Sequence, residues 1–183
     1  MIRTITTKLT QSKSLISTSA RTLMTFADAQ VERSVMEMAA KKPELMEKVE
    51  MLKASSQTYH VREGTGKFDH RKLEVEIRPK AHHQHEESVA HEIFHGAHFE
   101  SIRAPNKLNA EGIFELEDHR PIIEKAALIF GKRMTGPLKK EDVEAHFQQY
   151  VDQGLLPAWS DTKHKPLLDK AYHAMAKKEF DQL

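Results

Sequence analysis

A glutamate stands between two histidines that are four residues apart, and these residue types at this spacing can activate water. Residues 91–95 read His-Glu-Ile-Phe-His, which has the form H-E-x-x-H. Residues i and i+4 share one face of a helix, so His91 and His95 can bind a single ion. A zinc ion held there lowers the pKa of its bound water. Glu92 is then the expected general base, taking the proton as the water attacks a carbonyl.

The lack of cysteine narrows the kind of site that the chain can build. It has 183 residues, with 12 histidines and no cysteine. This excludes disulfides, thiolate zinc sites, iron–sulfur clusters and a cysteine nucleophile. Imidazole and carboxylate remain as metal ligands, a set that suits zinc, iron or manganese. We expect one catalytic Zn2+ ion at His91 and His95.

The composition gives no support for a nucleic-acid partner or for a membrane-spanning segment. Lys and Arg number 28 and Asp and Glu number 27, so the net charge is +1, and nothing in it favours nucleic-acid binding. The longest apolar runs, such as 126–130, are too short to cross a bilayer. We therefore expect neither a nucleic-acid partner nor a transmembrane segment. The length supports one domain with appendages.

Hydrophobic periodicity predicts the elements that must position the motif. Leu73, Val75 and Ile77 alternate with polar residues up to Arg78, which predicts a half-buried strand over 73–78. Residues 86–102 predict a helix that carries the motif. Helical spacing also predicts helices within 27–55, 111–134, 141–153 and 166–180, with Pro43 in a first turn and Pro121 at a restart. The expected fold class is α+β, mostly helical, with a small β-sheet next to the motif helix.

The strand over 73–78, followed by a helix that carries HEIFH, resembles the zincin metallopeptidases. The resemblance covers about residues 67–134, and its specific part is the five-residue motif. In zincins the strand lies along the cleft and pairs with extended substrate. The resemblance implies a zincin-like domain that binds a protein or peptide substrate and hydrolyses its peptide bonds.

The subgroup of zincins depends on the third ligand. Metzincins continue as H-E-x-x-H-x-x-G-x-x-H, but His98 stands at the glycine position and Ser101 at the last histidine position. His98 is then expected behind the ligands or at the surface. A glutamate on the next helix, as in gluzincins, fits better. The candidates are Glu111, Glu115, Glu117 and Asp118.

Two of these carboxylates are preferred. Glu115 lies 20 residues after His95, within the gluzincin range. Glu117 opens a Glu-Asp-His-Arg stretch that resembles the Glu-Glu-x-Arg stretch of NleD-like type III secreted effector proteases. Glu117 is slightly favoured as the third metal ligand, with Glu115 close behind.

Most of the remaining histidines are expected at exposed positions away from the metal. His82, His83 and His85 are expected in an exposed polar loop, with a secondary metal site or a substrate contact as the alternatives. His146, His164 and His173 are expected at helix surfaces. Three groups could stabilise an oxyanion, and the sequence does not select among them: Tyr150, Tyr172 and His119.

The first 26 residues differ in composition from the rest. Residues 1–26 contain four basic residues, no acidic residue and many Ser and Thr. Such a leader is typical of a mitochondrial transit peptide, of a type III secretion signal or of a disordered basic tail. We expect residues 27–183 to form a single zincin-like metallopeptidase domain. Secretion into a host cell is favoured, with a mitochondrial metalloprotease as the alternative.

Three functions follow from these patterns. The leading one is a zinc-dependent endopeptidase, with a secreted bacterial effector that cleaves host proteins as its expected setting. The second is a non-proteolytic zincin-like module that binds a metal or a partner, which predicts a filled or occluded site. The third is a helical interaction protein with a coincidental motif, which predicts that His91 and His95 point apart.

Overall fold

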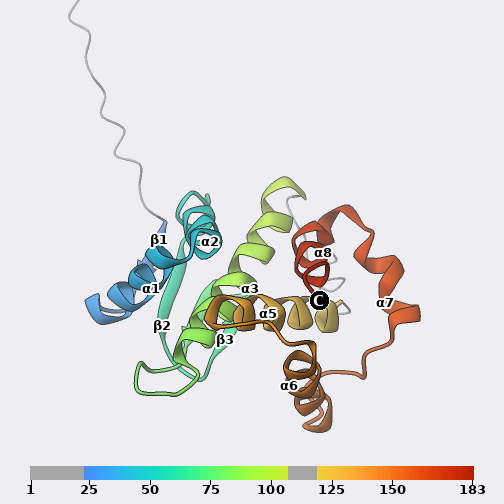
Figure 1. Cartoon of the computed structure of the whole chain (residues 1–183). Helices are drawn as coiled ribbons and strands as arrows, with labels where there is room; N and C mark the ends of the chain where they lie inside the picture. The colour runs from blue at the N-terminus through green and yellow to red at the C-terminus, as the bar shows by residue number, and fades with distance from the viewer. Residues whose placement is uncertain (1–22, 107–118) are drawn as a thin grey trace, which may run out of the picture.

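The computed structural model describes residues 23–106 and 119–183, and its elements are shown in Figure 1. Helices make up most of the described residues, alongside one small mixed sheet. This confirms the expected α+β class and the predominance of helices. In chain order the elements are β1 (Met24–Phe26), α1 (Ala29–Lys41), α2 (Pro43–Lys53), β2 (Tyr59–Glu63), β3 (Lys67–Asp69), β4 (Glu74–Ile77), α3 (His85–Asn106), α5 (Arg120–Thr135), α6 (Lys140–Asp152), α7 (Asp161–Leu168), the 3-10 turn η1 (Ala171–His173) and α8 (Ala174–Phe180).

The sheet has the strand order β1-β2-β4-β3, with β3 at one edge. The β1–β2 and β2–β4 pairs are parallel, whereas β3 runs antiparallel to β4. The strand expected over 73–78 is confirmed as β4. It is hydrogen-bonded on both sides, however, so it cannot be the strand that pairs with a substrate. In the described part of the sheet, β3 is the edge strand next to β4.

The folded region begins earlier than the sequence indicated. Met24 is 3% exposed, and β1 pairs with β2 through Met24 and Tyr59. The Ala27 amide donates to the carbonyl of Val61 at 2.8 Å. Residues 24–26, which the composition grouped with the leader, therefore form a strand of the sheet, and a three-residue strand is too short to show a periodicity. Residues 1–22 lie outside the described part of the chain.

The first two helices begin at residues with clear physical roles. The Asp28 carboxylate caps α1 by accepting from the amides of Gln30 and Val31, at 2.8 and 2.9 Å. Pro43 opens α2, where its missing N–H costs no helical hydrogen bond. The pair of helices and the position of Pro43 are confirmed.

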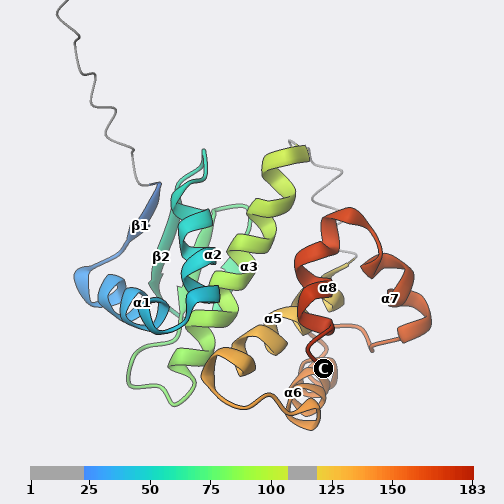
Figure 2. The same cartoon turned by 45° about the horizontal axis from the view of Figure 1, so that its top comes forward.

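Helix α3 runs through the centre of the molecule, with α2 on one side and α5 on the other (Figure 2). Gly96 allows the close approach to α2 and the sheet. A Cβ at this position would lie 3.3 Å from Leu52 and 3.6 Å from Val75. The segment expected over 86–102 is confirmed as α3. Because apolar residues of α3 pack against both neighbours, its central turns are held between them.

The C-terminal region departs from the sequence-based expectation. The single helix expected over 166–180 is instead the end of α7, the turn η1 and the short helix α8. His164 and His173 are 2% and 0% exposed, so their expected surface positions are wrong. A histidine in a helical segment is usually assigned to the polar, exposed face. In this structure the ring of His164 instead packs against Trp159, and the ring of His173 packs against Tyr172.

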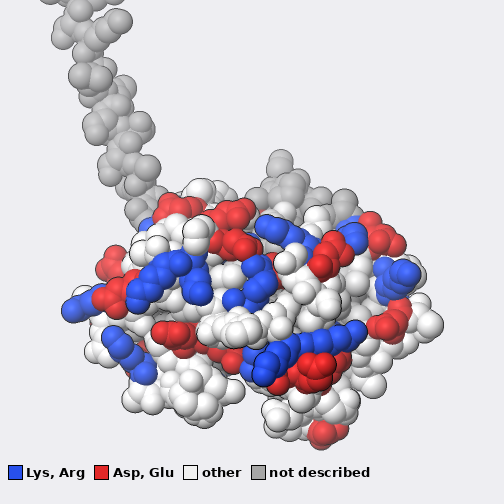
Figure 3. Space-filling model, viewed as in Figure 1, with Lys and Arg blue, Asp and Glu red and all other residues white. Residues whose placement is uncertain are grey.

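Two surface properties agree with the composition. No helix in residues 23–106 or 119–183 is long and apolar enough to cross a membrane. On the face seen in Figure 3, basic and acidic side chains are interspersed and form no large patch of one sign. This distribution matches the net charge of +1.

Candidate metal centre

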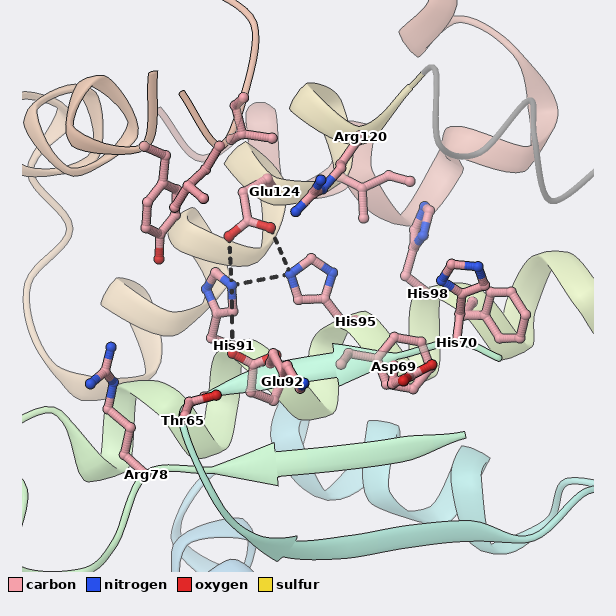
Figure 4. Close-up of a pocket in the computed structure, with 18 of the residues that line it drawn as sticks. Thr65, Asp69, His70, Arg78, His91, Glu92, His95, His98, Arg120 and Glu124 are labelled. Atoms are coloured by element: carbon pink, nitrogen blue, oxygen red, sulfur yellow. Dashed lines mark hydrogen bonds and ion pairs between the residues drawn. The ribbon is translucent and has the colours of Figure 1, made fainter. Parts of the chain in front are cut away.

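The two histidines of the motif point at the same place. They lie one turn apart on α3, and their Nε2 atoms are 3.1 Å from each other (Figure 4). His91 is 7% exposed. A coincidental motif predicts rings that point apart, and this expectation is wrong. Two imidazole nitrogens facing each other at this distance are suited to sharing one cation.

A carboxylate from the next described helix meets both rings. Glu124 of α5 places Oε1 2.9 Å from Nε2 of His91 and Oε2 3.2 Å from Nε2 of His95. Burial raises the pKa of Glu124, but the two histidines outweigh it and hold the pKa well below its usual range. Among the described carboxylates, Glu124 is the one that contacts both imidazole nitrogens. It is therefore the candidate third ligand.

Glu124 was not among the carboxylates proposed from the sequence. Those candidates, Glu115 and Glu117 with Glu111 and Asp118, all lie outside the described residues, so their role stays a prediction. A usable signal was present, because Glu124 is the single acid in α5 and directly follows Ile122 and Ile123. An acidic residue in an apolar helix that packs on the motif helix needs a cationic partner.

The three donor atoms fit a zinc-type site. Bonds of about 2.0–2.1 Å in a tetrahedron separate the ligand atoms by about 3.3–3.4 Å. The two imidazole nitrogens are 3.1 Å apart, and each faces a different oxygen of Glu124, at 2.9 and 3.2 Å, so these separations are close to this value. Two imidazoles and one carboxylate are also a donor set typical of catalytic zinc. The residues present therefore fit the ion that the motif implies.

Close packing of α5 on α3 brings the ligands together. Gly131 of α5 faces the first turns of α3, and a Cβ there would lie 3.3 Å from the carbonyl oxygen of Glu87 and 3.5 Å from Cβ of His91. Glycine at this position lets α5 approach α3 closely enough for Glu124 to reach the imidazoles.

Glu87 ties three helices together beside the site. Its carboxylate accepts from Nζ of Lys132 on α5 at 3.0 Å and lies 3.4 Å from Nδ1 of His146 on α6. Burial raises the pKa of Glu87, but hydrogen bonds from His146 and Lys132 outweigh it and lower the pKa to about 2. This contact holds α5 and α6 against the helix that carries the motif.

Glu92 is buried next to the donor atoms. It is 5% exposed, and its Oε1 lies 4.0 Å from Nε2 of His91. Burial raises its pKa to about 8, and the charge of Glu124 adds to the rise, whereas His95 and Arg78 oppose it. A carboxylate that sits close to the ligands without joining them has the position of a general base.

An open cavity of about 970 Å³ borders the donor atoms, at the upper end of the size range of ligand sites. Its walls come from the β3 edge and the following turn, from α3, from the first turn of α5, and from the end of α6. Leu155, which is 51% exposed, stands at the rim. The second hypothesis, a non-proteolytic module, predicts a filled or occluded site, whereas these residues form an open cavity.

The structure separates the three candidates for oxyanion stabilisation. Tyr150 lines the cavity, and burial raises the pKa of its hydroxyl, with Glu124 and Glu92 adding to the rise. Tyr172 and His119 instead face each other, with the hydroxyl 2.9 Å from Nδ1. Tyr150 therefore keeps its proton at neutral pH and can donate it in a hydrogen bond.

His98 and Ser101 take no part in the donor set. Burial lowers the pKa of His98 to about 3, with His173 and His95 contributing, so its ring is neutral inside the protein. It lines the cavity and stacks on Phe94. The Ser101 hydroxyl donates to the carbonyl of His98 at 2.7 Å. Neither His98 nor Ser101 therefore supplies the third ligand that the metzincin pattern would require.

The loop before α3 is partly as expected. His83 is exposed, but His85 is 8% exposed, so the expectation of an exposed position is wrong for His85. The His85 ring lies between the Ser34 hydroxyl and the carbonyl of Arg78.

Comparisons with protein-family models, with curated proteins and with solved structures gave no match. The metal centre is therefore inferred from the donor atoms and the cavity beside them.

Proposed function

We propose that this protein is a zinc-dependent endopeptidase. His91, His95 and Glu124 hold the ion, and Glu92 is the general base. The observation that carries the proposal is the position of the Glu124 carboxylate, which faces both imidazole nitrogens at the wall of an open cavity. An open site with a buried glutamate beside it favours an enzyme over a binding module.

The residues of the chain divide the chemical work. Bound zinc supplies a lowered pKa for water and polarises the carbonyl of the substrate. The Glu92 carboxylate accepts the proton of the attacking water and passes it to the amide nitrogen that leaves. The Tyr150 hydroxyl donates a hydrogen bond to the developing oxyanion.

The edge of the sheet offers a place for an extended substrate. All three residues of β3 line the cavity, and β3 pairs with β4 on one side only. A peptide that adds to the free edge of β3 gains main-chain hydrogen bonds and lies alongside the donor atoms. Binding along the backbone does not require a chain end, which fits an endopeptidase.

Metal content and proteolysis of unfolded casein test the proposal. We expect Glu92→Gln to keep its zinc and to lose about 10²–10⁴-fold in activity, the usual contribution of a general base. His91→Ala should lose the zinc. Glu86→Gln is the matched control, because Glu86 is exposed on the same helix. Full activity in the Glu92→Gln protein would contradict the proposed role.

A further inference from the structure

Three arginines of the described residues bind carboxylates. Arg62 contacts Glu74 and Glu76, Arg103 contacts Glu100, and Arg133 contacts Glu44 and Glu179. Arg78 lines the cavity and differs from them. Within residues 23–106 and 119–183 it has no carboxylate within 4.0 Å, and its Nη1 contacts Nε2 of His82 at 3.3 Å. A guanidinium has five N–H donors, so most remain available.

The backbone and the stem of Arg78 are held in place. Its amide donates to Oγ of Ser88 at 3.0 Å, and its carbonyl lies 2.6 Å from Nδ1 of His85. The turn at Gly66 packs against the stem, where a Cβ would lie 3.3 Å from Cγ of Arg78. Gly66 has a φ of +80°, a conformation that glycine adopts without strain. A side chain fixed in this way loses little entropy when it binds a ligand.

Arg78 lies close to the reacting groups. Arg78 lines the same cavity as Glu92 and Tyr150. In Figure 4, Arg78 lies on the His91 side of the donor atoms, whereas Arg120 lies on the other side, beyond Glu124. A ligand bound by Arg78 is therefore near the bond that the site cleaves.

Of the other charged residues in the cavity, Arg120 is exposed and has no carboxylate within 4.0 Å in residues 23–106 and 119–183, whereas four others have partners of their own. Glu92 and Glu124 belong to the metal centre. The Asp69 carboxylate accepts from the amides of Arg71 and Lys72, at 3.0 and 3.2 Å. Lys67 lies 3.8 Å from Glu76. The cavity thus presents Arg78 to a ligand, and the planar guanidinium matches a carboxylate with two parallel hydrogen bonds.

We propose that Arg78 binds a carboxylate of the peptide substrate next to the scissile bond, so that the site prefers peptides with Asp or Glu at one position. This inference rests on the proposed peptidase function and names its substrate class. The carboxylate comes from an acidic side chain or from the C-terminus of the peptide, and the two sources share this chemistry.

Peptide libraries measure this preference directly. The probes are acetylated and amidated decapeptides that carry Glu or Gln at each position in turn, and a second set with free C-termini. For the zinc-loaded wild type we expect Glu to raise kcat/KM over Gln at one position by roughly 10- to 100-fold, the worth of a charge-assisted hydrogen bond. In Arg78→Gln the ratio should fall to about one. In Arg78→Lys it should be partly retained, and in Arg78→Glu reversed in favour of Lys peptides.

Two control variants separate Arg78 from the general charge of the protein. Arg120→Gln removes a charge from the same cavity, and Arg33→Gln removes one from the exposed face of α1. Both should keep the Glu-to-Gln ratio at the position that Arg78 sets. An equal loss of the ratio in Arg120→Gln overturns the assignment to Arg78. A preference that follows the free C-terminus identifies the chain end as the source of the carboxylate.

A binding measurement keeps this inference distinct from the proposed function. The affinities of the Glu and Gln peptides for zinc-loaded Glu92→Gln protein require no catalysis. A wild type that cleaves no peptide contradicts the peptidase function, whereas tighter binding of the Glu peptide still supports the role of Arg78. Equal binding of the two peptides, with equal cleavage by the wild type, overturns the role of Arg78 and leaves the peptidase function standing.

Discussion

Replacing Glu124 with glutamine tests the third ligand, because the change keeps the shape of the side chain and removes its charge. The carboxylate oxygens lie 2.9 and 3.2 Å from the two imidazole nitrogens, and the side chain is 16% exposed. At a free zinc concentration about 100 times the dissociation constant, zinc stabilises the wild type by about 2.7 kcal/mol. For a protein of this size that corresponds to a rise in Tm of about 5–11 °C.

The expected effect in the variant is much smaller. Changing a group behind a metal ligand weakens binding by about 10- to 100-fold, so losing a ligand should cost at least about 100-fold. The same zinc concentration then equals the dissociation constant of Glu124→Gln. The stabilisation falls to about 0.4 kcal/mol, a rise in Tm of about 1–2 °C. Thermal unfolding with and without zinc measures both values.

Three further variants complete this experiment. Glu141→Gln, at an exposed position of α6, should behave like the wild type. Glu115→Gln and Glu117→Gln test the ligands that the sequence favoured, and both should keep the full rise in Tm. An unchanged rise in Glu124→Gln, with a loss in either of the other two, would refute the assignment of Glu124.

Three more predictions concern pH, packing and targeting. The depressed pKa of Glu87 stabilises the fold above about pH 4.5, and this contribution is lost as pH falls toward 2. Chemical denaturation at pH 7 should show that Glu87→Gln has a free energy of unfolding about 1–2 kcal/mol below that of the wild type, allowing for solvent screening. This difference should disappear near pH 2. A difference that does not change with pH would contradict the stabilising role of the ionised Glu87. Gly131→Ala should push α5 away from His91 and so weaken zinc binding, as measured by calorimetry. This is expected even though alanine stabilises a helix by about 1 kcal/mol relative to glycine. An unchanged zinc affinity would argue against the close contact between α5 and α3. Residues 1–26 fused to a reporter should not enter mitochondria, and import would overturn the preference for a secreted effector.

The parts of the site that are local in sequence were predictable. His91, Glu92 and His95 lie within five residues, so helical spacing alone brings the two imidazoles to one face. Glu124 follows His95 by 29 residues and reaches the site only because α5 packs on α3. No periodicity encodes such a contact.

The fold was predictable to a similar degree. Alternation over 73–78 and helical spacing over 86–102 gave β4 and α3, since both are long enough to show a period. β1 and β3 have three residues each, too few to show one. The burial of His173 depends on rings brought together from distant parts of the chain, so it could not be predicted from the short turn η1 that contains it.

Anomalous diffraction at the zinc edge, from crystals of the zinc-loaded protein, tests the central claim most directly. We predict one strong peak at bonding distance, about 2.0–2.2 Å, from Nε2 of His91, Nε2 of His95 and a carboxylate oxygen of Glu124. A peak held by other residues, or no peak between the two imidazoles when zinc is present, would contradict the metal centre described here.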